Sequence, residues 1–274
     1  MFIGGKEFKT KEKTYLMGIL NFTPDSFSDG GKYSRIDRAL FRVQQMIEEG
    51  ADLLDIGGES TRPQATPVEV SEELSRVIPI IEAIKKNFDI PLSLDTYKAI
   101  VAEEGIKAGA DLINDIWGIQ REQDMARVIA RYQVPCCLMH NRKVGEYQDF
   151  IKDVMDDFSN ILHTAERAGI KEENIILDPG IGFAKDTAQN LALLSQLKVC
   201  KELGFPILLG VSRKSVVGNV LNLPVEERLN GTLALNILGY MEGCAFLRVH
   251  DVRPHKEALT MLEAVKGNTE GEKR

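Results

Sequence analysis

The chain has few cysteines, a single tryptophan and no excess of positive charge. Four of its 274 residues are cysteines, and none forms a CxxC pair or a His/Cys cluster with the spacing of a zinc site. So few cysteines in so long a chain argue against a disulfide framework. The adjacent Cys136 and Cys137 stand in an apolar run, so we expect their thiols to be buried.

Long apolar runs are also missing. No stretch approaches the roughly 20 apolar residues of a membrane-spanning helix. No N-terminal segment combines a basic end with an apolar stretch, as a secretion signal does. We therefore expect no membrane partner and a cytoplasmic location. The formal net charge of −7 argues against a nucleic-acid partner, but it still allows a local anion site built from a few Arg and Lys residues.

Short apolar runs alternate with longer amphipathic stretches along the chain. Hydrophobic residues make up 43% of the sequence, enough for a sizeable core. The apolar runs show little polar alternation, which is typical of parallel strands buried on both faces. The eight predicted strands are Tyr15–Leu20, Asp52–Ile56, Pro91–Leu94, Asp111–Ile116, Pro135–Met139, Ile175–Asp178, Ile207–Val211 and Cys244–Val249. Apolar residues at helical spacing predict helices over Arg35–Glu49, Glu69–Asn87, Asp149–Ala168 and Leu191–Leu203.

Eight strand–helix alternations in a chain of this length predict an α/β fold, a (β/α)8 TIM barrel. We expect a single domain over residues 1–274, with its core at about 15–265 and a frayed tail over 267–274. A doubly wound open sheet is the alternative. That fold usually carries a GxGxxG phosphate loop after its first strand, whereas residues 21–31 form a polar loop without this fingerprint.

Polar residues gather where the predicted strands end. They are Asn21, Asp55, Asp95, Asn114, Asp115, His140, Asp178, Ser212, Arg213, Lys214, Ser215, Arg248, His250 and Asp251. In a barrel the carboxyl ends of the strands converge on one face, where active sites lie. Helix N-capping explains a single Asp, Asn or Ser equally well, but capping requires neither a cation nor an imidazole.

Three of these residues suit a flat heterocycle. Asp95, Asn114 and Asp178 are short and rich in acceptors, and they match an amino-amidine edge with a neighbouring carbonyl, as in a pterin. Paired carboxylates could instead serve acid/base catalysis in a glycosidase, but aromatic residues for sugar stacking are scarce near these strand ends.

Another group suits a phosphate. Arg248, His250 and Asn21 offer a fixed cation, an imidazole and an amide oxygen, which fit a phosphate bound with a divalent metal. A structural histidine is the alternative for His250 taken alone. Lys214 could be a Schiff-base lysine, but it follows Ser212 in a polar turn, which favours a hydrogen-bonding role.

Several motifs follow one another along the chain. They are GILNFTPDSFSDGG (18–31), DIGGESTRP (55–63), SLDT (93–96), INDI (113–116), DPGIGF (178–183), GVSRKS (210–215) and LRVHD (247–251). Together they resemble the dihydropteroate synthase family over residues 15–265, approximately. The resemblance implies a transferase of folate biosynthesis that condenses 6-hydroxymethyl-7,8-dihydropterin pyrophosphate with p-aminobenzoate, giving 7,8-dihydropteroate and pyrophosphate.

The resemblance also implies roles for individual residues. The implied pterin contacts are Asp95, Asn114, Asp178 and Lys214. The implied pyrophosphate contacts are Asn21, Thr61, Arg248 and His250, with Asn21 as the ligand of the expected cofactor, Mg²⁺. The implied aminobenzoate contacts are Thr61, Arg62, Pro63, Phe183 and Ser215. Asp95, Lys214 and Arg248 are the implied catalytic residues, and the family further implies a homodimer and competition by sulfonamides.

For this reaction we expect an SN1-like, magnesium-assisted mechanism. Departure of pyrophosphate leaves a methylene cation conjugated with the pterin, while Mg²⁺ and Arg248 neutralise the leaving group. Asp95 stabilises the cationic pterin, and the unprotonated arylamine attacks without a strong base. Because water would trap the cation, we expect the loop that carries Phe22 and Phe27 to act as a lid, together with the loop after the second strand.

Three other readings stay open. A barrel that passes the methyl group of methyltetrahydrofolate to a corrinoid protein would share the Asp and Asn positions, but it would not need Arg248 or His250. A non-catalytic pterin-binding paralogue is disfavoured by the intact set of Asn21, Lys214 and Arg248. A purely structural barrel would leave the convergent polar face unexplained.

The chain departs from the family pattern in three places. Gln64 and Ala184 stand where a glycine is frequent, and Asn141-Arg142 follows His140 where many members have a methionine. These changes bear on the loops and on the response to sulfonamides, and they leave the implied pterin and phosphate residues in place.

Overall fold

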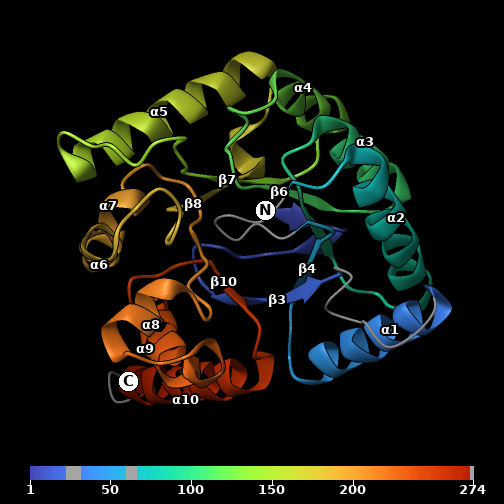
Figure 1. The fold of residues 1–274 in the computed structure, drawn as a ribbon. Helices are drawn as coiled ribbons and strands as arrows, with labels where there is room; N and C mark the ends of the chain where they lie inside the picture. The colour runs from blue at the N-terminus through green and yellow to red at the C-terminus, as the bar shows by residue number, and fades with distance from the viewer. Residues whose placement is uncertain (23–31, 60–66, 272–274) are drawn as a thin grey trace.

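Eight parallel strands form one sheet that curls into a barrel (Figure 1). The structure, a computed structural model, describes residues 1–22, 32–59 and 67–271. The strands are β3 (Tyr15–Asn21), β4 (Leu53–Gly57), β5 (Leu92–Asp95), β6 (Leu112–Asp115), β7 (Cys136–Met139), β8 (Ile175–Asp178), β9 (Leu208–Leu209) and β10 (Phe246–Val249). All eight predicted strands are confirmed, although the seventh shortens to two residues.

The sheet closes on itself. Its strand order is β8-β7-β6-β5-β4-β3-β10-β9. A parallel bridge between Leu177 and Ile207 joins the two ends, and the Leu177 amide donates to the Pro206 carbonyl at 2.9 Å. The predicted (β/α)8 barrel is therefore the observed architecture, and the open-sheet alternative is wrong.

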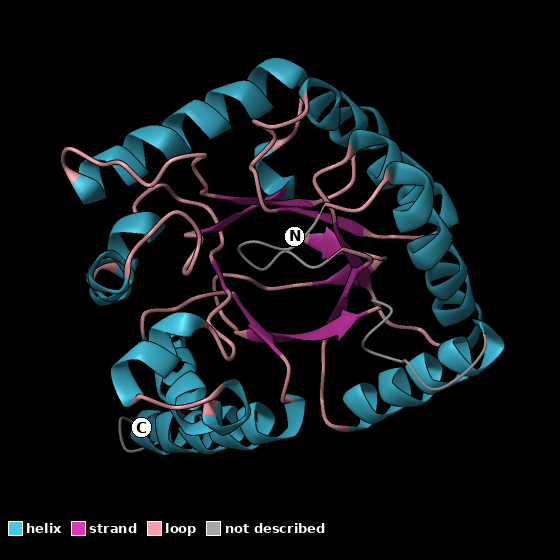
Figure 2. Ribbon diagram, in the orientation of Figure 1, coloured by secondary structure: helices cyan, strands magenta, loops and turns pink. Residues whose placement is uncertain are grey.

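Helices surround the barrel (Figure 2). They are α1 (Lys32–Glu48), α2 (Val70–Asn87), α3 (Ala99–Ala108), α4 (Gln123–Tyr132), α5 (Phe150–Ala168), α6 (Thr187–Ser195), α7 (Leu197–Lys201), α8 (Ser215–Leu221), α9 (Leu229–Met241) and α10 (Val252–Gly271), with short 3₁₀ turns at Glu172–Asn174 and Val225–Glu227. The helix predicted over Leu191–Leu203 is two helices, because Gln196 leaves the helical region with φ −124° and ψ 27°. No helix of the described residues is long and apolar enough to span a membrane.

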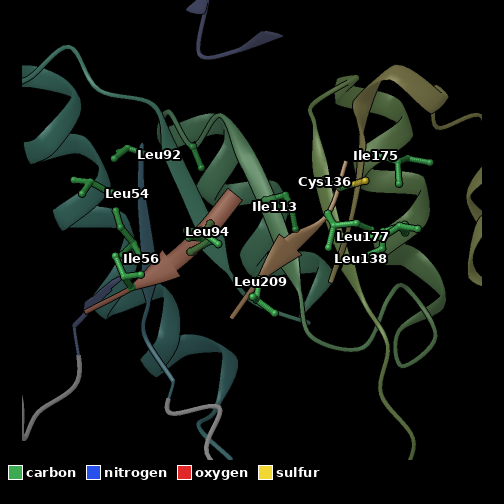
Figure 3. Packing of buried hydrophobic residues seen from close by; sticks show 14 of the residues in the cluster. Leu54, Ile56, Leu92, Leu94, Ile113, Cys136, Leu138, Ile175, Leu177 and Leu209 are labelled. Atoms are coloured by element: carbon green, nitrogen blue, oxygen red, sulfur yellow. The ribbon is translucent and has the colours of Figure 1, made fainter. Parts of the chain in front are cut away.

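Strand side chains alternate between two apolar layers. One layer packs against the helices and includes Leu54, Ile113, Leu177 and Leu209 (Figure 3). The other layer lies inside the barrel and contains no helical residue of the described chain; its members include Leu53, Leu112, Ile176, Leu208 and Phe246. All four cysteines are buried free thiols, as predicted for Cys136 and Cys137.

An N-terminal hairpin that the sequence reading missed closes one end of the barrel. Strands β1 (Phe2–Ile3) and β2 (Lys6–Glu7) pair around Gly4 and Gly5, which have φ of 58° and 77°. Ile3 is fully buried in the inner layer. The signal was present, because two glycines between short strands are typical of a tight hairpin turn.

Candidate active site

The inner layer changes from apolar to polar toward the carboxyl ends of the strands. Its lower positions include Leu53, Leu112, Ile176 and Phe246. Two residues further on stand Asp55, Asn114, Asp178 and Arg248. Because every second side chain of a strand faces the same side, these four polar groups point into the barrel above the apolar plug. A polar mouth therefore forms at the end where barrel active sites lie.

Four neighbouring strands bring residues at or next to their carboxyl ends into register at this mouth. Asn21 pairs with Gly57, Gly57 with Asp95, and Asp95 with Asn114. A Cβ on Gly57 would lie 3.7 Å from the Asp95 Cβ and 3.9 Å from the Asn21 Oδ1. The glycine therefore leaves room between the amide of Asn21 and the carboxyl of Asp95.

Asp55 accepts hydrogen bonds from three residues of the mouth. Its side chain is fully buried. It accepts hydrogen bonds from Arg248 Nε at 2.6 Å, Ser93 Oγ at 2.5 Å and Asn114 Nδ2 at 3.2 Å. Such a buried carboxylate is stable only when its partners satisfy it, and here it orients both an arginine and an amide.

Asp95 carries the most unusual group of the site. Its Oδ2 accepts from Arg248 Nη2 at 2.7 Å, whereas its buried Oδ1 has no hydrogen-bond partner among the described residues. Burial raises the pKa of Asp95 to about 8, which outweighs the opposing effect of Arg248, and Asp55 adds to the rise. Buried acceptors are normally paired, so this oxygen is suited to a donor from a ligand.

Asp178 and Lys214 border a second part of the mouth. A Cβ on Gly210 would lie 3.5 Å from Asp178 Oδ2 and 3.6 Å from Lys214 Nζ, so the glycine leaves open the space between them. Asp178 Oδ1 accepts from the Gly180 amide at 2.7 Å. Burial raises the pKa of Asp178 against the effect of Lys214, and burial lowers the pKa of Lys214 to about 8.

The segments after β9 and β10 are tied to each other. His250 Nδ1 lies 2.9 Å from Ser212 Oγ, and the His250 amide donates to the same oxygen at 3.2 Å. Arg213 binds Asp251 through two parallel bonds of 3.0 and 2.7 Å. The imidazole of His250 is thus held beside the segment that carries Lys214.

The implied aminobenzoate residues are placed only in part. The Phe183 ring lies 4.8 Å from Lys214 Nζ, and Ser215 opens α8 directly after Lys214. The structure therefore brings the Phe183 ring to Lys214, and Ser215 is placed only as the residue that follows Lys214. Thr61, Arg62 and Pro63 lie outside the described residues, as do Phe27 and Gln64.

The donor set at the mouth fits Mg²⁺ bound by substrate rather than by a protein cage. No group of three or more His, Cys, Asp or Glu side chains suited to a metal occurs within residues 1–22, 32–59 and 67–271. Mg²⁺ commonly takes one or two protein oxygens together with waters and substrate phosphates. Asn21, an exposed residue at the end of β3, offers one such amide oxygen.

Sequence reasoning left Asp55 and Ser93 without a role. Asp55 lies two residues after the inward Leu53, and Ser93 lies two residues before the inward Asp95. Because side chains alternate along a strand, both could have been assigned to the site from the sequence. It also left out Lys185, whose ammonium binds backbone carbonyls near Phe183. No sequence signal announces that contact, because it depends on how the loop after β8 folds back.

Comparison with known proteins agrees with this geometry. The family model described as pterin binding enzyme matches residues 17–250. Dihydropteroate synthase of Clostridium beijerinckii is 58% identical, covering 97% of this chain and 99% of the relative. The solved dihydropteroate synthase from Clostridium difficile, in the presence of pteroic acid, has a TM-score of 0.92 at 47% identity, covering 94% of this chain and 99% of that one.

A second solved structure is similar in kind. The Xanthomonas albilineans dihydropteroate synthase with 4-aminobenzoic acid has a TM-score of 0.89 at 42% identity, covering 93% of this chain and 94% of that one. Barrel, polar mouth and family match together define a pterin-binding barrel enzyme. Within that class, the chain belongs to the dihydropteroate synthase family of transferases.

Proposed function

We propose that the barrel mouth condenses 6-hydroxymethyl-7,8-dihydropterin pyrophosphate with p-aminobenzoate to give 7,8-dihydropteroate and pyrophosphate. The observation that carries this proposal is the unpartnered, buried Oδ1 of Asp95 beside Asn114 and Arg248. A pterin offers adjacent N–H donors that such an oxygen lacks. The structures of two relatives, one in the presence of pteroic acid and one with 4-aminobenzoic acid, support a pterin and an arylamine as the substrates.

Pterin recognition follows from the two sides of the mouth. Asp95 and Asn114 present acceptors and an amide donor on adjacent strands, and they take the donor edge of the ring. Asp178 and Lys214 border the space over Gly210, where a carboxylate and an ammonium can bind the remaining edge. Rigid strands carry three of these four groups, so the ring is oriented before reaction.

The reacting bond joins the pterin methylene to the pyrophosphate oxygen. As the C–O bond breaks, its electron pair leaves with pyrophosphate, and the methylene cation is conjugated with the ring. Asp95, on the ring, opposes the positive charge, and Arg248 lies next to it as a fixed cation for the leaving group. Asn21 and the phosphate oxygens would hold Mg²⁺, which supplies charge neutralisation of the diphosphate.

The arylamine nitrogen then forms the new C–N bond with the methylene and loses its proton. An aromatic amine is unprotonated at neutral pH, so no strong base is needed. We assign Phe183 and Ser215 to the aminobenzoate side, together with Thr61, Arg62 and Pro63 from the segment after β4. Thr61 and His250 also contact the pyrophosphate. Sulfonamides compete with p-aminobenzoate for its position. The protein acts as a homodimer.

The proposal is tested by incubating the purified protein with both substrates and Mg²⁺. We expect dihydropteroate and pyrophosphate to form in equal amounts. Folded protein that forms neither product would contradict the proposal and favour a non-catalytic pterin-binding role. Pyrophosphate without dihydropteroate would place water, rather than the arylamine, at the cation.

A further inference from the structure

A short turn after β8 sets the position of Phe183. The Phe183 amide donates to the Gly180 carbonyl at 3.1 Å, which closes the turn over residues 180–183. Gly180 and Gly182 have φ of 69° and 86°, a region that glycine adopts without strain. A Cβ on Gly180 would lie 2.0 Å from the carbonyl oxygen of His140, so the turn is packed closely against β7. Small displacements of this turn would therefore move the Phe183 ring.

Lys185 binds the turn through its ammonium group. Its Nζ lies 3.0 Å from the Gly180 carbonyl oxygen, 3.1 Å from the Phe183 carbonyl oxygen and 2.9 Å from His140 Nδ1. Burial lowers the pKa of Lys185 to about 7. In its ammonium form the side chain has three N–H donors, and these three acceptors use all of them. Lys185 thus links the first and last residues of the turn to His140, the residue that follows β7.

His140 can accept from Lys185 only as a neutral ring. Its side chain is fully buried, and burial lowers its pKa to about 4. A neutral imidazole has one donor nitrogen and one acceptor nitrogen. Asp157 Oδ2 lies 2.9 Å from Nε2 and takes the N–H, which leaves the Nδ1 lone pair for Lys185. Arg142 Nε also donates to Asp157 Oδ2, at 2.6 Å, and holds that carboxylate in place.

We infer that Lys185 is a positioning residue for the arylamine substrate, held by a directional chain from Asp157 through His140. The chain places the ammonium under the two carbonyls of the turn, and the turn places Phe183 beside Lys214. This inference rests on the proposed function, in which Phe183 contacts p-aminobenzoate. Lys185 itself contacts backbone and imidazole, and it acts through them.

The effect is expected on one substrate more than on the other. Asp95 and Asn114 lie on β5 and β6, and their side chains form no hydrogen bond with the turn among the described residues. Lys214 and Asp178 do contact the turn, through the Ile181 carbonyl and the Gly180 amide. Other bonds also hold them, however, because Asp178 lies on β8 and the Lys214 amide donates to the Val211 carbonyl at 3.2 Å. Loss of Lys185 should therefore weaken arylamine use while pterin binding persists. General unfolding would weaken both.

The test compares Lys185→Met with Lys198→Met, which removes an exposed lysine of α7. For Lys185→Met we expect KM for p-aminobenzoate to rise at least tenfold, with less than a threefold change in KM for the pterin pyrophosphate. Lys198→Met should change neither. An unchanged KM for p-aminobenzoate, or equal rises of both KM values, would overturn the inference.

A second pair of variants decides the matter if Lys185→Met does not fold. In His140→Gln the amide can still accept from Lys185 and donate to Asp157, whereas in His140→Leu it can do neither. We expect His140→Gln to keep KM for p-aminobenzoate within threefold of the wild type and His140→Leu to raise it at least tenfold. Equal KM values for p-aminobenzoate in the two variants would contradict a role for the hydrogen bonds that link Asp157, His140 and Lys185.

A readout without catalysis separates this inference from the proposed function. Amide hydrogen exchange of a peptide covering residues 179–186 should be at least tenfold faster in Lys185→Met than in Lys198→Met. If the wild type forms no dihydropteroate, the proposed function fails, yet faster exchange would still support the role of Lys185 in the turn. Unchanged exchange would remove that role even in an active enzyme.

Discussion

Arg248 on β10 reaches Asp95 on β5, and the bond between Nη2 and Oδ2 measures 2.7 Å. Two other strands, β3 and β4, separate these strands in the sheet. The bond therefore crosses the mouth of the barrel and joins the leaving-group side of the proposed site to its pterin side. The same guanidinium binds Asp55, so its position depends on two carboxyl groups at once.

Asp55→Asn tests whether Asp55 positions Arg248 and Asn114. The amide would turn a donor toward groups that already donate, so we expect turnover to fall by about 100-fold, as for a misplaced reacting group. Loss of a buried ionic partner should also lower the free energy of unfolding by about 3 kcal/mol. Glu104→Gln, which breaks an exposed pair with Lys107, is the control, and it should cost less than about 1 kcal/mol. Steady-state kinetics measures turnover, and urea unfolding measures stability. Wild-type turnover in Asp55→Asn would show that Asp55 is not needed to position Arg248 and Asn114.

Binding of a pterin should release a proton. In the unliganded protein the pKa of Asp95 is about 8, chiefly because of burial, so the carboxyl is mostly protonated at pH 7. Donors of the pterin edge favour the carboxylate and lower that pKa. Calorimetric titration with 6-hydroxymethyl-7,8-dihydropterin in buffers of different ionisation enthalpy should show release of about one proton. Binding without measurable release of protons would contradict the assignment of Asp95. The Asp95→Asn variant, which has no carboxyl proton to lose, should show no release.

Much of this site could be predicted from the sequence, because a barrel turns order along the chain into neighbours in space. Asp95, Asn114, Asp178 and Arg248 each stand in one of the last two positions of a short strand, and parallel strands bring such ends together. The motif from Gly210 to Ser215 likewise placed Lys214 correctly at the mouth. The mouth could thus be predicted without any knowledge of contacts between side chains.

The contacts themselves could not be predicted. Arg248 was expected to bind a phosphate, and its bonds to Asp55 and Asp95 were not expected. These bonds depend on which carboxyl groups lie within reach of the arginine side chain. The fold of the turn at residues 180–183 depends on the positive φ of Gly180 and Gly182. The break between α6 and α7 lies in the backbone of Gln196, where no proline or glycine marks it.

Ala184 shows the cost of one departure from the family pattern. Its φ of 47° lies in the left-handed region, which explains why glycine is frequent there. We expect Ala184→Gly to raise the free energy of unfolding by about 0.5–1 kcal/mol, since relief of strain exceeds the added flexibility of the unfolded chain. Ala192→Gly, inside α6, should instead lower it by about 1 kcal/mol. Chemical denaturation of both variants checks the sign, and destabilisation by Ala184→Gly would show that the turn tolerates alanine.

The neutral ring of His140 predicts a loss of stability in mild acid. Its pKa is about 4 in the folded protein, because of burial, and about 6.5 in an unfolded chain. The unfolded state therefore binds more protons between these values, so the contribution of His140 is complete above pH 6.5 and falls as the pH drops toward 4. Asp157, Lys185 and Arg142 are the charged groups around it.

Urea unfolding at pH 7 and pH 5 measures this effect. Between these values the stability of the wild type should fall by about 2 kcal/mol more than that of His140→Gln. His163→Gln, which changes a largely exposed histidine, should behave as the wild type does. An equal fall in wild type and His140→Gln would mean that His140 takes up its proton in the folded protein without penalty.

The most direct test of the proposed chemistry follows pyrophosphate and dihydropteroate together in the wild type, Asp95→Ala and Arg248→Ala. Circular dichroism at the assay temperature should first establish that each variant is folded. We expect equal amounts of the two products in the wild type and a loss of at least about 100-fold of both in each variant, as when a group that stabilises transition-state charge is removed. Near-normal release of pyrophosphate by both folded variants would contradict the assignment of Asp95 and Arg248 to the reacting end of the barrel.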